Sequence, residues 1–517
     1  MFKKSELRIY THHFSITCRD YALRSHLERF CSRLRQWGLV PERGQMVRKP
    51  LKDFASVTRD GVVWRFHIGI YKEFLTSLEY TRFLGVIDIT QEPLYAPVKT
   101  SYEINPVYTD RDYQIPAIEF LSKPPDPNDD RVGLRSRLLR FRMGRGKSYT
   151  IMRAIQVVGE RCLFMVRATY VDKWVADLKR TYVLEEDDIC VVADGVVNIK
   201  KALKKAAEGK NDKVKIYVMS MDTHKSWLRL YESFGTDTLK MGFACLPHEM
   251  FKTLGVGVRG MDEVHQHFHA CYREDLFTHV PLGIGLSATL LPQDFFLKQR
   301  QAEMFPPYVR YHDDAAVVYT YSESITYYFK KPEYIQTHER GSTQWSSNAF
   351  EASIIKHKPT LYRYLDMLAK VALASFGQVK RPKKRLLVLA YKVEMVDLIV
   401  ERFRAAFPGL AVKRYVSGSP WEDLMESDIS VSTYGKAGTA VDVADLTNLL
   451  VTINMGAEGG NIQISGRLRQ LSDGHKVLMQ CMVAGNIAKS VEFDRARQKA
   501  LQGWIVEQKD VSFGSEI

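Results

Sequence analysis

The sequence predicts an α/β protein with two tandem units, each built on a parallel sheet, preceded by a small basic α+β domain. Three observations support this fold class. At 517 residues the chain is too long for one ordinary core. Its hydrophobic content of 45% and charged content of 26% are those of a folded globular chain. Helix-like and strand-like patterns alternate in two separate regions, which is typical of parallel sheets covered by helices.

Residues 1–95 are expected to form the small α+β domain. The stretch YALRSHLERFCSRLRQWG predicts an amphipathic helix that ends at Gly38. The apolar positions expected on its buried face are Leu23, Leu27, Phe30, Cys31 and Leu34. This segment holds 16 Lys+Arg and 10 Asp+Glu, so it carries +6 of the net charge of +14. It is either a nucleic-acid-docking module or a domain with a solvated, arginine-rich helix face.

The next segment, QEPLYAPVKTSYEINPVY, holds three prolines and is expected to be a linker. Two α/β units are then predicted, over residues 101–310 and 311–517, with a linker or helical insertion near 330–385. The run KRPKKR resembles a nuclear localisation signal, but it directly precedes a strand of buried type. We therefore interpret it as a solvated linker.

The charge and the cysteines restrict the compartment and the partners. A net charge of +14 favours a polyanion such as nucleic acid. The seven cysteines are scattered without a Cys-x-x-Cys pair, which indicates reduced thiols rather than a disulfide framework or a zinc ribbon. No apolar run reaches the length of a membrane helix, and the N-terminus does not resemble a secretion signal. We expect a cytoplasmic protein that is not secreted and has no membrane partner.

The stretch RFRMGRGKSYT indicates a phosphate-binding turn ahead of a helix. Gly144 and Gly146 would let backbone N–H groups close on a phosphate, with Lys147 on the β and γ oxygens and the Ser148 hydroxyl on Mg²⁺. A full P-loop has a small residue where this chain has Phe141. The alternative is a glycine turn with a purely structural role.

The stretch MDEVHQHFH supplies the carboxylate pair that such a site requires. Asp262 would hold Mg²⁺ and Glu263 would orient and deprotonate the attacking water. His265, His267 and His269 stand at alternate positions and could bind a metal ion. Because no further histidine or cysteine cluster has metal-ligand spacing, we interpret His267 and His269 as surface or packing residues.

In this order the motifs resemble those of superfamily 2 helicases and translocases of the DExH type. The resemblance implies two RecA-like domains with ATP and Mg²⁺ bound between them. RDYQIPAI resembles the family's Q-type motif, which implies that Gln114 reads the adenine. VRATYVDKW resembles a motif that contacts the nucleic-acid backbone, with Trp174 as its last residue. GLSATL implies that Ser287 and Thr289 couple nucleotide state to domain closure, and His265 would connect the phosphate end to this motif.

The second unit shows two further resemblances. STYGKAGTAVD is similar to the motif around a Thr-Tyr-Gly, which implies a nucleic-acid contact at Thr433 and a coupling role for Asp442. QISGRLRQ is similar to the closing Gln-x-x-Gly-Arg motif, which implies Gln463 at the cleft and Arg467 as the arginine finger.

Two departures from the family pattern affect this half. The family's second arginine falls where this chain has Gln470, and Arg469 stands one residue early, so the resemblance leaves open which side chain reaches the γ-phosphate. A glycine of the family is replaced by Ala440.

The small basic N-terminal domain, the motifs and the length are most similar to the UvsW-like phage DNA helicases. This resemblance implies an ATP-dependent DNA helicase or translocase in a bacterial or phage-infected cell. It would unwind, rewind or branch-migrate single-stranded or branched DNA in replication, recombination or repair. The alternatives are an RNA helicase, an ATP-gated nucleic-acid clamp with weak turnover, and a metal-centred hydrolase built on the histidines.

Overall fold

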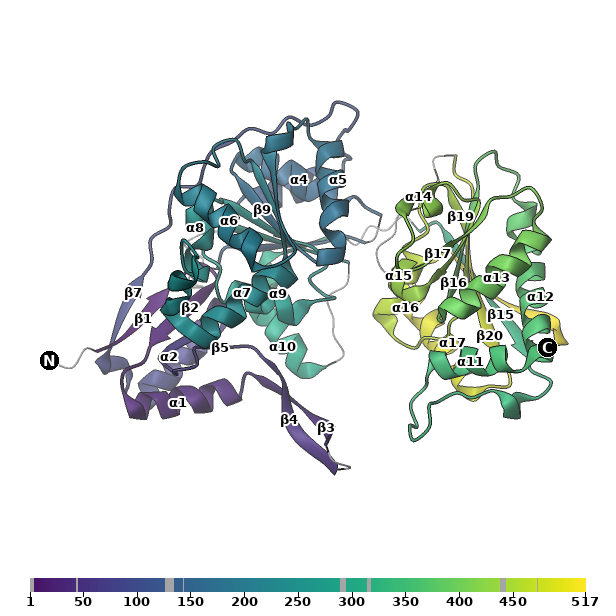
Figure 1. Cartoon of the computed structure of the whole chain (residues 1–517), viewed down its shortest axis with the longest axis horizontal. Coiled ribbons are helices and arrows are strands. Elements are labelled where there is room, and N and C mark those ends of the chain that lie inside the picture. The colour runs from purple at the N-terminus through teal and green to yellow at the C-terminus, as the bar shows by residue number, and fades with distance from the viewer. Residues whose placement is uncertain are drawn as a thin grey trace. The chain divides into compact units, whose positions relative to one another are not determined.

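The computed structural model describes residues 4–42, 45–125, 134–142, 144–288, 294–313, 318–437, 443–471 and 473–517. Contacts divide the chain into two compact units (Figure 1). The first comprises residues 1–141 and 145–313, and the second residues 142–144 and 314–517. Each unit has its own seven-stranded sheet among the described residues.

The N-terminal module is built on a mixed five-stranded sheet in the order β5-β6-β2-β1-β7. Its strands are β1 (Ser5–Ile9), β2 (His13–Thr17), β5 (Ser56–Val57), β6 (Val63–His67) and β7 (Ile87–Gln91), and its helices are α1 (Tyr21–Ser32) and α2 (Tyr71–Tyr80). Phe14 and Phe66 stack in the sheet at 5.3 Å, and Phe30 of α1 and Phe74 of α2 pack on them. The aromatic side chains therefore hold both helices on one face of the sheet.

The prediction that the first helix runs to Gly38 is wrong. The helix ends at Ser32, and the chain continues into an antiparallel hairpin of β3 (Arg35–Glu42) and β4 (Gln45–Asp53). Gly38 weakens a helix interior and Pro41 cannot donate a helical hydrogen bond, so pairing with β4 replaces the last predicted turns. Leu34 is nevertheless buried, as are the other four predicted apolar positions.

The first unit contains an all-parallel sheet in the order β10-β11-β9-β12-β13-β8-β14. The strands are β8 (Ser136–Arg140), β9 (Cys162–Val166), β10 (Ile189–Val192), β11 (Ile216–Ser220), β12 (Val258–Met261), β13 (Leu282–Ser287) and β14 (Arg310–His312). The helices are α3 (Ile115–Ser122), α4 (Lys147–Val158), α5 (Val171–Thr181), α6 (Val196–Ala207), α7 (Met221–Phe234), α8 (Met250–Leu254), α9 (Phe268–Asp275) and α10 (Phe295–Met304). The glycine-rich approach to β12 has a packing reason, because a Cβ on Gly260 would lie 2.6 Å from the Phe164 ring.

The N-terminal module has its own sheet but shares a core with this unit. One apolar cluster contains Phe14 and Phe66 of the module together with Leu163 and Tyr272 of the first unit. Polar contacts also cross the junction, where Thr11 Oγ1 accepts a hydrogen bond from the Val280 N–H at 3.0 Å. The module and the following α/β unit therefore form one compact body.

The second unit contains an all-parallel sheet in the order β17-β18-β16-β19-β20-β15-β21. The strands are β15 (Thr320–Tyr328), β16 (Arg385–Ala390), β17 (Val412–Tyr415), β18 (Ile429–Thr433), β19 (Leu446–Val451), β20 (Val477–Ala484) and β21 (Glu507–Glu516). The helices are α11 (Ser347–Lys356), α12 (Lys358–Ala374), α13 (Val393–Ala406), α14 (Trp421–Met425), α15 (Tyr434–Ala437), α16 (Glu458–Ser465) and α17 (Ala488–Leu501). Two parallel sheets with flanking helices and a small α+β module confirm the predicted fold class of tandem RecA-like domains.

Candidate nucleotide site

The glycine turn lies between β8 and α4 along the chain, and contacts assign Gly146 to the first unit and Gly144 to the second. Gly144 and Gly146 have φ of 81° and 73°, left-handed values that favour glycine. Gly146 is the N-cap residue of α4, so no side chain caps the first turn of that helix. Its N–H groups and the positive end of the helix dipole are therefore available to an anion.

Lys147 begins α4 and turns back toward the loop. Its ammonium donates to the carbonyl oxygen of Phe141 at 3.4 Å. Burial and Glu263 raise the pKa of Asp262 and the Lys147 charge opposes that rise, whereas at His265 burial lowers the pKa and the Lys147 charge adds to the fall. The fold thus brings Lys147 into the electrostatic field of the carboxylate motif that lies far along the sequence.

The side chain of Phe141 is fully buried, although this position is small in a full P-loop. Its ring contacts Tyr113 at 5.9 Å and Tyr311 at 6.1 Å between centroids. The ring is part of the core, and the backbone carbonyl faces Lys147. The substitution is accommodated by packing.

Gln114 lies against the glycine turn. Its Nε2 donates to Thr150 Oγ1 at 3.3 Å and to the Arg145 carbonyl at 3.4 Å, and its Oε1 accepts from the Arg111 N–H at 3.0 Å. A Cβ on Gly146 would lie 2.7 Å from the Gln114 amide nitrogen. Gln114 is therefore a structural neighbour of the phosphate turn, and its predicted contact with adenine stays a prediction.

Asp110 is a residue of this region that the sequence patterns did not single out. It receives two hydrogen bonds of 2.7 Å from Arg153 and one of 2.9 Å from the Tyr149 hydroxyl, both on α4. Arg153 lowers the pKa of the Asp110 carboxyl. This bidentate pair holds the segment before Gln114 on α4, and only its position just ahead of RDYQ could have indicated it.

Asp262 follows the last residue of β12, at the carboxyl end of a central strand. Its Oδ2 accepts a hydrogen bond of 2.9 Å from the indole N–H of Trp174, and its Oδ1 accepts one of 2.8 Å from the Glu263 N–H. Burial raises the pKa of Asp262 and the adjacent Glu263 adds to this, whereas Lys173, Lys147 and Trp174 oppose it. The carboxylate is thus held in a fixed orientation by two donors.

The position of Trp174 does not fit the predicted contact with nucleic acid. Its side chain has no exposed surface and packs on Phe164 at 4.5 Å between ring centroids. Because its one polar atom is engaged by Asp262, it orients the acidic motif.

Glu263 has a backbone φ of 46°, which is uncommon for a residue with a side chain. Strain of this kind costs about 1–3 kcal/mol and persists where the surroundings enforce it. Its carboxylate is partly exposed and lies 3.3 Å from His265 Nδ1. The conformation places a carboxylate beside Asp262 with access to solvent.

His265 joins two predicted motifs. Its Nδ1 lies 3.0 Å from Ser287 Oγ at the end of β13. Burial, and secondarily the charge of Lys147, lowers the pKa of His265 to about 4, so the imidazole is neutral at physiological pH. The structure brings His265 and Ser287 into contact, and their coupling roles stay predictions. Thr289 lies outside the described residues.

The other two histidines of the run have different surroundings. Burial and Arg167 lower the pKa of His267 to about 4. The His269 ring packs on Phe54 at 4.9 Å, and its Nε2 donates to the Asp53 carbonyl at 2.7 Å. Within the described residues, no group of three or more histidine, cysteine or acidic side chains is arranged to hold a metal ion.

The donors present fit Mg²⁺ bound with a nucleotide. Mg²⁺ commonly takes one or two protein oxygens and completes its shell with phosphate and water. Ser148 at the start of α4 and Asp262 after β12 offer such oxygens, and Lys147 lies near the same carboxylate. The arrangement is suited to binding a phosphate chain and activating a water.

In the second unit, Gln463 lies on α16 and Arg467 follows the end of that helix. Thr433 ends β18 and directly precedes α15. Gln463 and Arg467 are buried, and Arg467 Nε donates to the Gln463 carbonyl at 3.3 Å. Arg467 also lowers the pKa of the Tyr434 hydroxyl against the effect of burial, so it lies close to the residue after Thr433. The structure thus brings the Thr-Tyr-Gly and Gln-x-x-Gly-Arg motifs together.

Arg469 turns back on its own loop. Its Nη1 donates to the carbonyl oxygen of Gly466. Gln470, where the family has its second arginine, is exposed. Asp442 and Ala440 lie outside the described residues.

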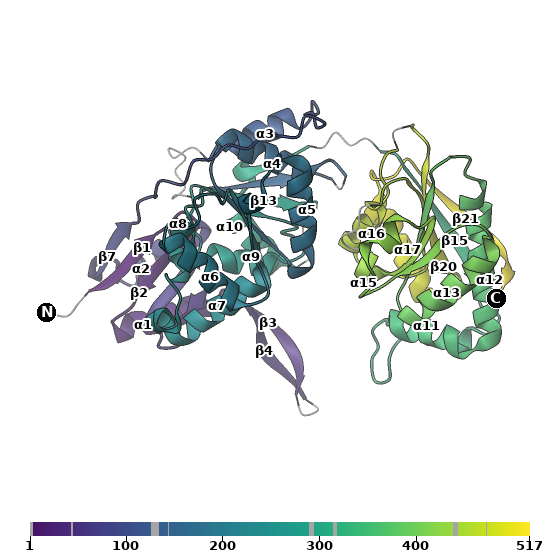
Figure 2. The same ribbon diagram turned by 45° about the horizontal axis from the view of Figure 1, so that its top comes forward.

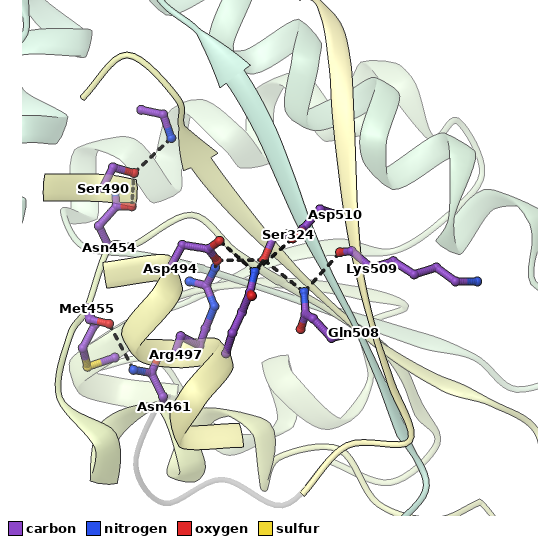
Figure 3. Close-up of polar contacts among 12 residues, drawn as sticks. Ser324, Asn454, Met455, Asn461, Ser490, Asp494, Arg497, Gln508, Lys509 and Asp510 are labelled. Atoms are coloured by element: carbon purple, nitrogen blue, oxygen red, sulfur yellow. Dashed lines mark hydrogen bonds and ion pairs between the residues drawn. The ribbon is translucent and has the colours of Figure 1, made fainter. Parts of the chain in front are cut away.

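A buried polar network connects the start of α16 with neighbouring segments, and α17 with β15 (Figure 3). Asn461 on α16 donates to the Met455 carbonyl at 3.0 Å, and Ser490 on α17 donates to Asn454 Oδ1 at 2.6 Å. Farther along α17, Asp494 accepts from the Ser324 hydroxyl on β15 at 2.7 Å. These bonds fix the loop from which the helix with Gln463 begins.

No family model matches the chain, and no curated protein sequence is significantly similar to it. Among solved structures, Saccharomyces cerevisiae Dbp5 bound to RNA and ADP–BeF3 matches with a TM-score of 0.49 and 11% identity, over 78% of this chain and 89% of that chain. A Dbp5 variant bound to Gle1 and IP6 gives 0.46 and 12%, over 89% and 96%. The Pyrococcus furiosus Hef helicase domain gives 0.43 and 12%, over 74% and 98%. Likenesses this distant carry no argument about function, which depends on the site itself.

Along the described parts of the chain, every helix is too short or too polar to cross a bilayer.

Proposed function

We propose that this protein is a nucleic-acid-dependent ATPase that works as a DNA helicase or translocase. The observation that carries the proposal is the grouping around Lys147. The glycine turn, Asp262 with its Trp174 donor, and His265 against Ser287 meet at the carboxyl ends of adjacent strands. Ligands of open α/β sheets bind at this edge.

In the proposed mechanism, the first-turn N–H groups of α4 and the Lys147 ammonium bind the phosphate chain. Ser148 and Asp262 would hold Mg²⁺, which neutralises charge on the phosphates when bound. Glu263 accepts the proton of the attacking water. It is suited to this because its carboxylate is partly exposed, while Asp262 is engaged by two donors.

The second unit supplies the coupling side chains in this proposal. Arg467 would stabilise the charge on the transferred phosphoryl group, and Gln463 would sense it, so that hydrolysis depends on closure. Thr433 and the basic surfaces would contact the nucleic-acid backbone, which predicts little sequence preference. Unwinding, rewinding or branch migration of DNA would follow from repeated closure.

Phosphate release tests the proposal, measured with single-stranded DNA, forked DNA, a four-way junction and RNA as activators. We expect stimulation by DNA and its loss in Lys147→Ala. The matched control is Lys240→Ala, which removes an exposed lysine paired with Asp237. Stimulation by RNA alone would identify an RNA helicase. Nucleotide-dependent binding without turnover would identify a clamp, and unchanged turnover in Lys147→Ala would exclude the proposed site.

A further inference from the structure

The β3–β4 hairpin projects from the body of the first unit in both views (Figures 1 and 2). We call these two strands the hairpin arm. They pair antiparallel from Arg35↔Asp53 to Glu42↔Gln45. An isolated two-stranded ribbon is marginal in water, so an exposed one suggests a surface that a partner covers.

The arm exposes large apolar side chains along much of its length. Trp37, Leu39, Met46 and Leu51 are 40%, 64%, 60% and 54% exposed. Leu39 lies opposite Arg48 in the register, and side chains two residues apart on a strand share a face. Trp37, Leu39 and Arg48 therefore belong to one face. On it the Arg48 guanidinium lies 5.4 Å from the centroid of the Trp37 ring.

The charge of the arm selects the partner. Its strands carry four basic and two acidic residues, and both acids are ion-paired inside the arm, Asp53 with Arg35 and Glu42 with Lys49. Among the described residues, Arg48 and Lys52 have no carboxylate partner, which leaves the arm positive. Apolar wedges flanked by cations are used by proteins that insert side chains between base steps. An aromatic ring stacked with arginine is a platform for an unpaired base.

The root of the arm is fixed to segments that follow the nucleotide motifs. Gln36 Nε2 donates to Asp294 Oδ2 at 2.6 Å, and Asp294 caps α10, which follows the Ser287 strand. At the other strand, His269 of α9 donates to the Asp53 carbonyl at 2.7 Å. Phe54 then packs against His269 and Tyr272. The arm is thus held at its base while its apolar face stays exposed.

We propose that the hairpin arm binds nucleic acid. Trp37 stacks on an unpaired base, Leu39 and Met46 wedge beside it, and Arg48 and Lys52 contact flanking phosphates. The inference deepens the proposed function, since it names the element that grips the substrate of that ATPase. A second copy of the chain would bring like charge against the arm, since the chain carries a net charge of +14, whereas nucleic acid neutralises it.

Binding of fluorescently labelled forked DNA and single-stranded DNA to the full chain, without ATP, tests the arm. Trp37→Ala is expected to weaken binding about tenfold, which is within the range of one stacked base. Trp37→Phe keeps a ring and should retain most of the affinity. The matched control is Tyr80→Ala, which removes an aromatic ring that is 90% exposed elsewhere in the N-terminal module.

The charged residues are tested through salt. In the double variant Arg48→Ala with Lys52→Ala, the slope of log affinity against log salt should fall by about two, one for each phosphate contact. Phosphate release without nucleic acid and the melting temperature should not change, because the arm lies outside the core. Unchanged affinity and slope in all variants would overturn the proposal. So would a change in sedimentation that leaves nucleic-acid affinity intact, since this would indicate a contact between copies. Because the affinity and salt-slope measurements need no hydrolysis, they can succeed or fail independently of the proposed ATPase.

Discussion

The two sheets have the same topology but carry different chemistry. When the strands are numbered in chain order within each seven-stranded sheet, both sheets follow the order 3-4-2-5-6-1-7, and all neighbours are parallel. In the first unit, strand one (β8) leads directly into the glycine turn and α4. In the second unit, strand one (β15) is followed by α11 and α12 before β16. The glycine turn followed directly by a helix is therefore present in one copy of the topology.

The fifth strands differ in the same way. In the first unit β12 is followed by Asp262 and Glu263, and the Lys147 charge acts on Asp262. In the second unit β19 is followed by a loop in which Asn454 Oδ1 accepts a hydrogen bond from the Ser490 hydroxyl. The fold sets where the strand ends lie, and the residues placed there decide whether an end does chemistry or packs.

Exchanging a side chain at these two strand ends should have opposite kinds of effect. Glu263→Gln removes the proposed base and should lower phosphate release about 10²–10⁴-fold while nucleotide still binds. Asn454→Ala leaves the Ser490 hydroxyl without its acceptor and should cost about 1–3 kcal/mol of stability with little change in turnover per folded molecule. Steady-state phosphate release and chemical denaturation measure the two effects.

Turnover near the parent value in Glu263→Gln would break this contrast, because the first unit's strand end would then have no catalytic role. The contrast between the two strand ends would also be contradicted if Asn454→Ala lost more turnover than its loss of folded protein explains.

A smaller effect is expected at Trp174, whose indole orients Asp262. Trp174→Phe keeps most of the packing but removes a hydrogen bond to a charged group, worth about 1.5–3 kcal/mol. Loss of this donor raises the Asp262 pKa further, so activity should decline at a higher pH as the solution is acidified. The pH profile of phosphate release measures this.

The control for Trp174 is Trp227→Phe, at another fully buried tryptophan of the first unit, stacked on Phe243. It should lower stability without moving the acidic limb of the profile. An identical profile for Trp174→Phe and the parent would show that the indole does not act on the carboxylate.

Mild acid should affect the units unequally. Burial lowers the pKa of His12, His13, His248 and His279 in the first unit. Their folded pKa values lie below the unfolded value of about 6.5, so the unfolded state binds more protons and stability falls as the pH drops below 6.5. One carboxyl of that unit, Glu303, acts against them, because burial raises its pKa to about 7.

The second unit contains the reverse case. Burial raises the pKa of Glu351 to about 7, so its contribution is present at low pH and is lost as the pH rises through 7. Hydrogen exchange at pH 7 and pH 5 should show the first unit losing protection while the second unit gains it. Equal loss in both units would contradict the assignment of acid sensitivity to the buried histidines.

Local patterns predicted the elements whose signals are contained in a short window. The helix expected after the glycine turn is α4, and the buried strand expected directly after KRPKKR is β16. The amphipathic pattern of α4 stops at Gly159, and β16 is a continuous apolar run. His269, which the sequence indicated as a surface or packing residue, packs on Phe54.

Features that depend on distant partners could not be predicted in this way. The arm strands continue an amphipathic helical pattern, and only their pairing with each other shows that the helix stops at Ser32. The hydrogen bond of Trp174 joins residues 88 positions apart, and no local signal announces it. The shared strand order of the two sheets could not be predicted from the sequence either, because different apolar side chains can fill equivalent buried positions.

The last strand of the first unit lies next to the strand that leads into the glycine turn. β14, its last strand, pairs with β8, and Asp313 just beyond it forms an ion pair of 2.6 Å with Arg145 between the two loop glycines. Arg145 also stacks over Tyr113 at 3.9 Å. The ion pair and ligand binding at the turn are therefore thermodynamically linked: a ligand that must break the Arg145–Asp313 pair to bind is weakened by the free energy that the pair contributes, and its binding disfavours the pair by the same amount.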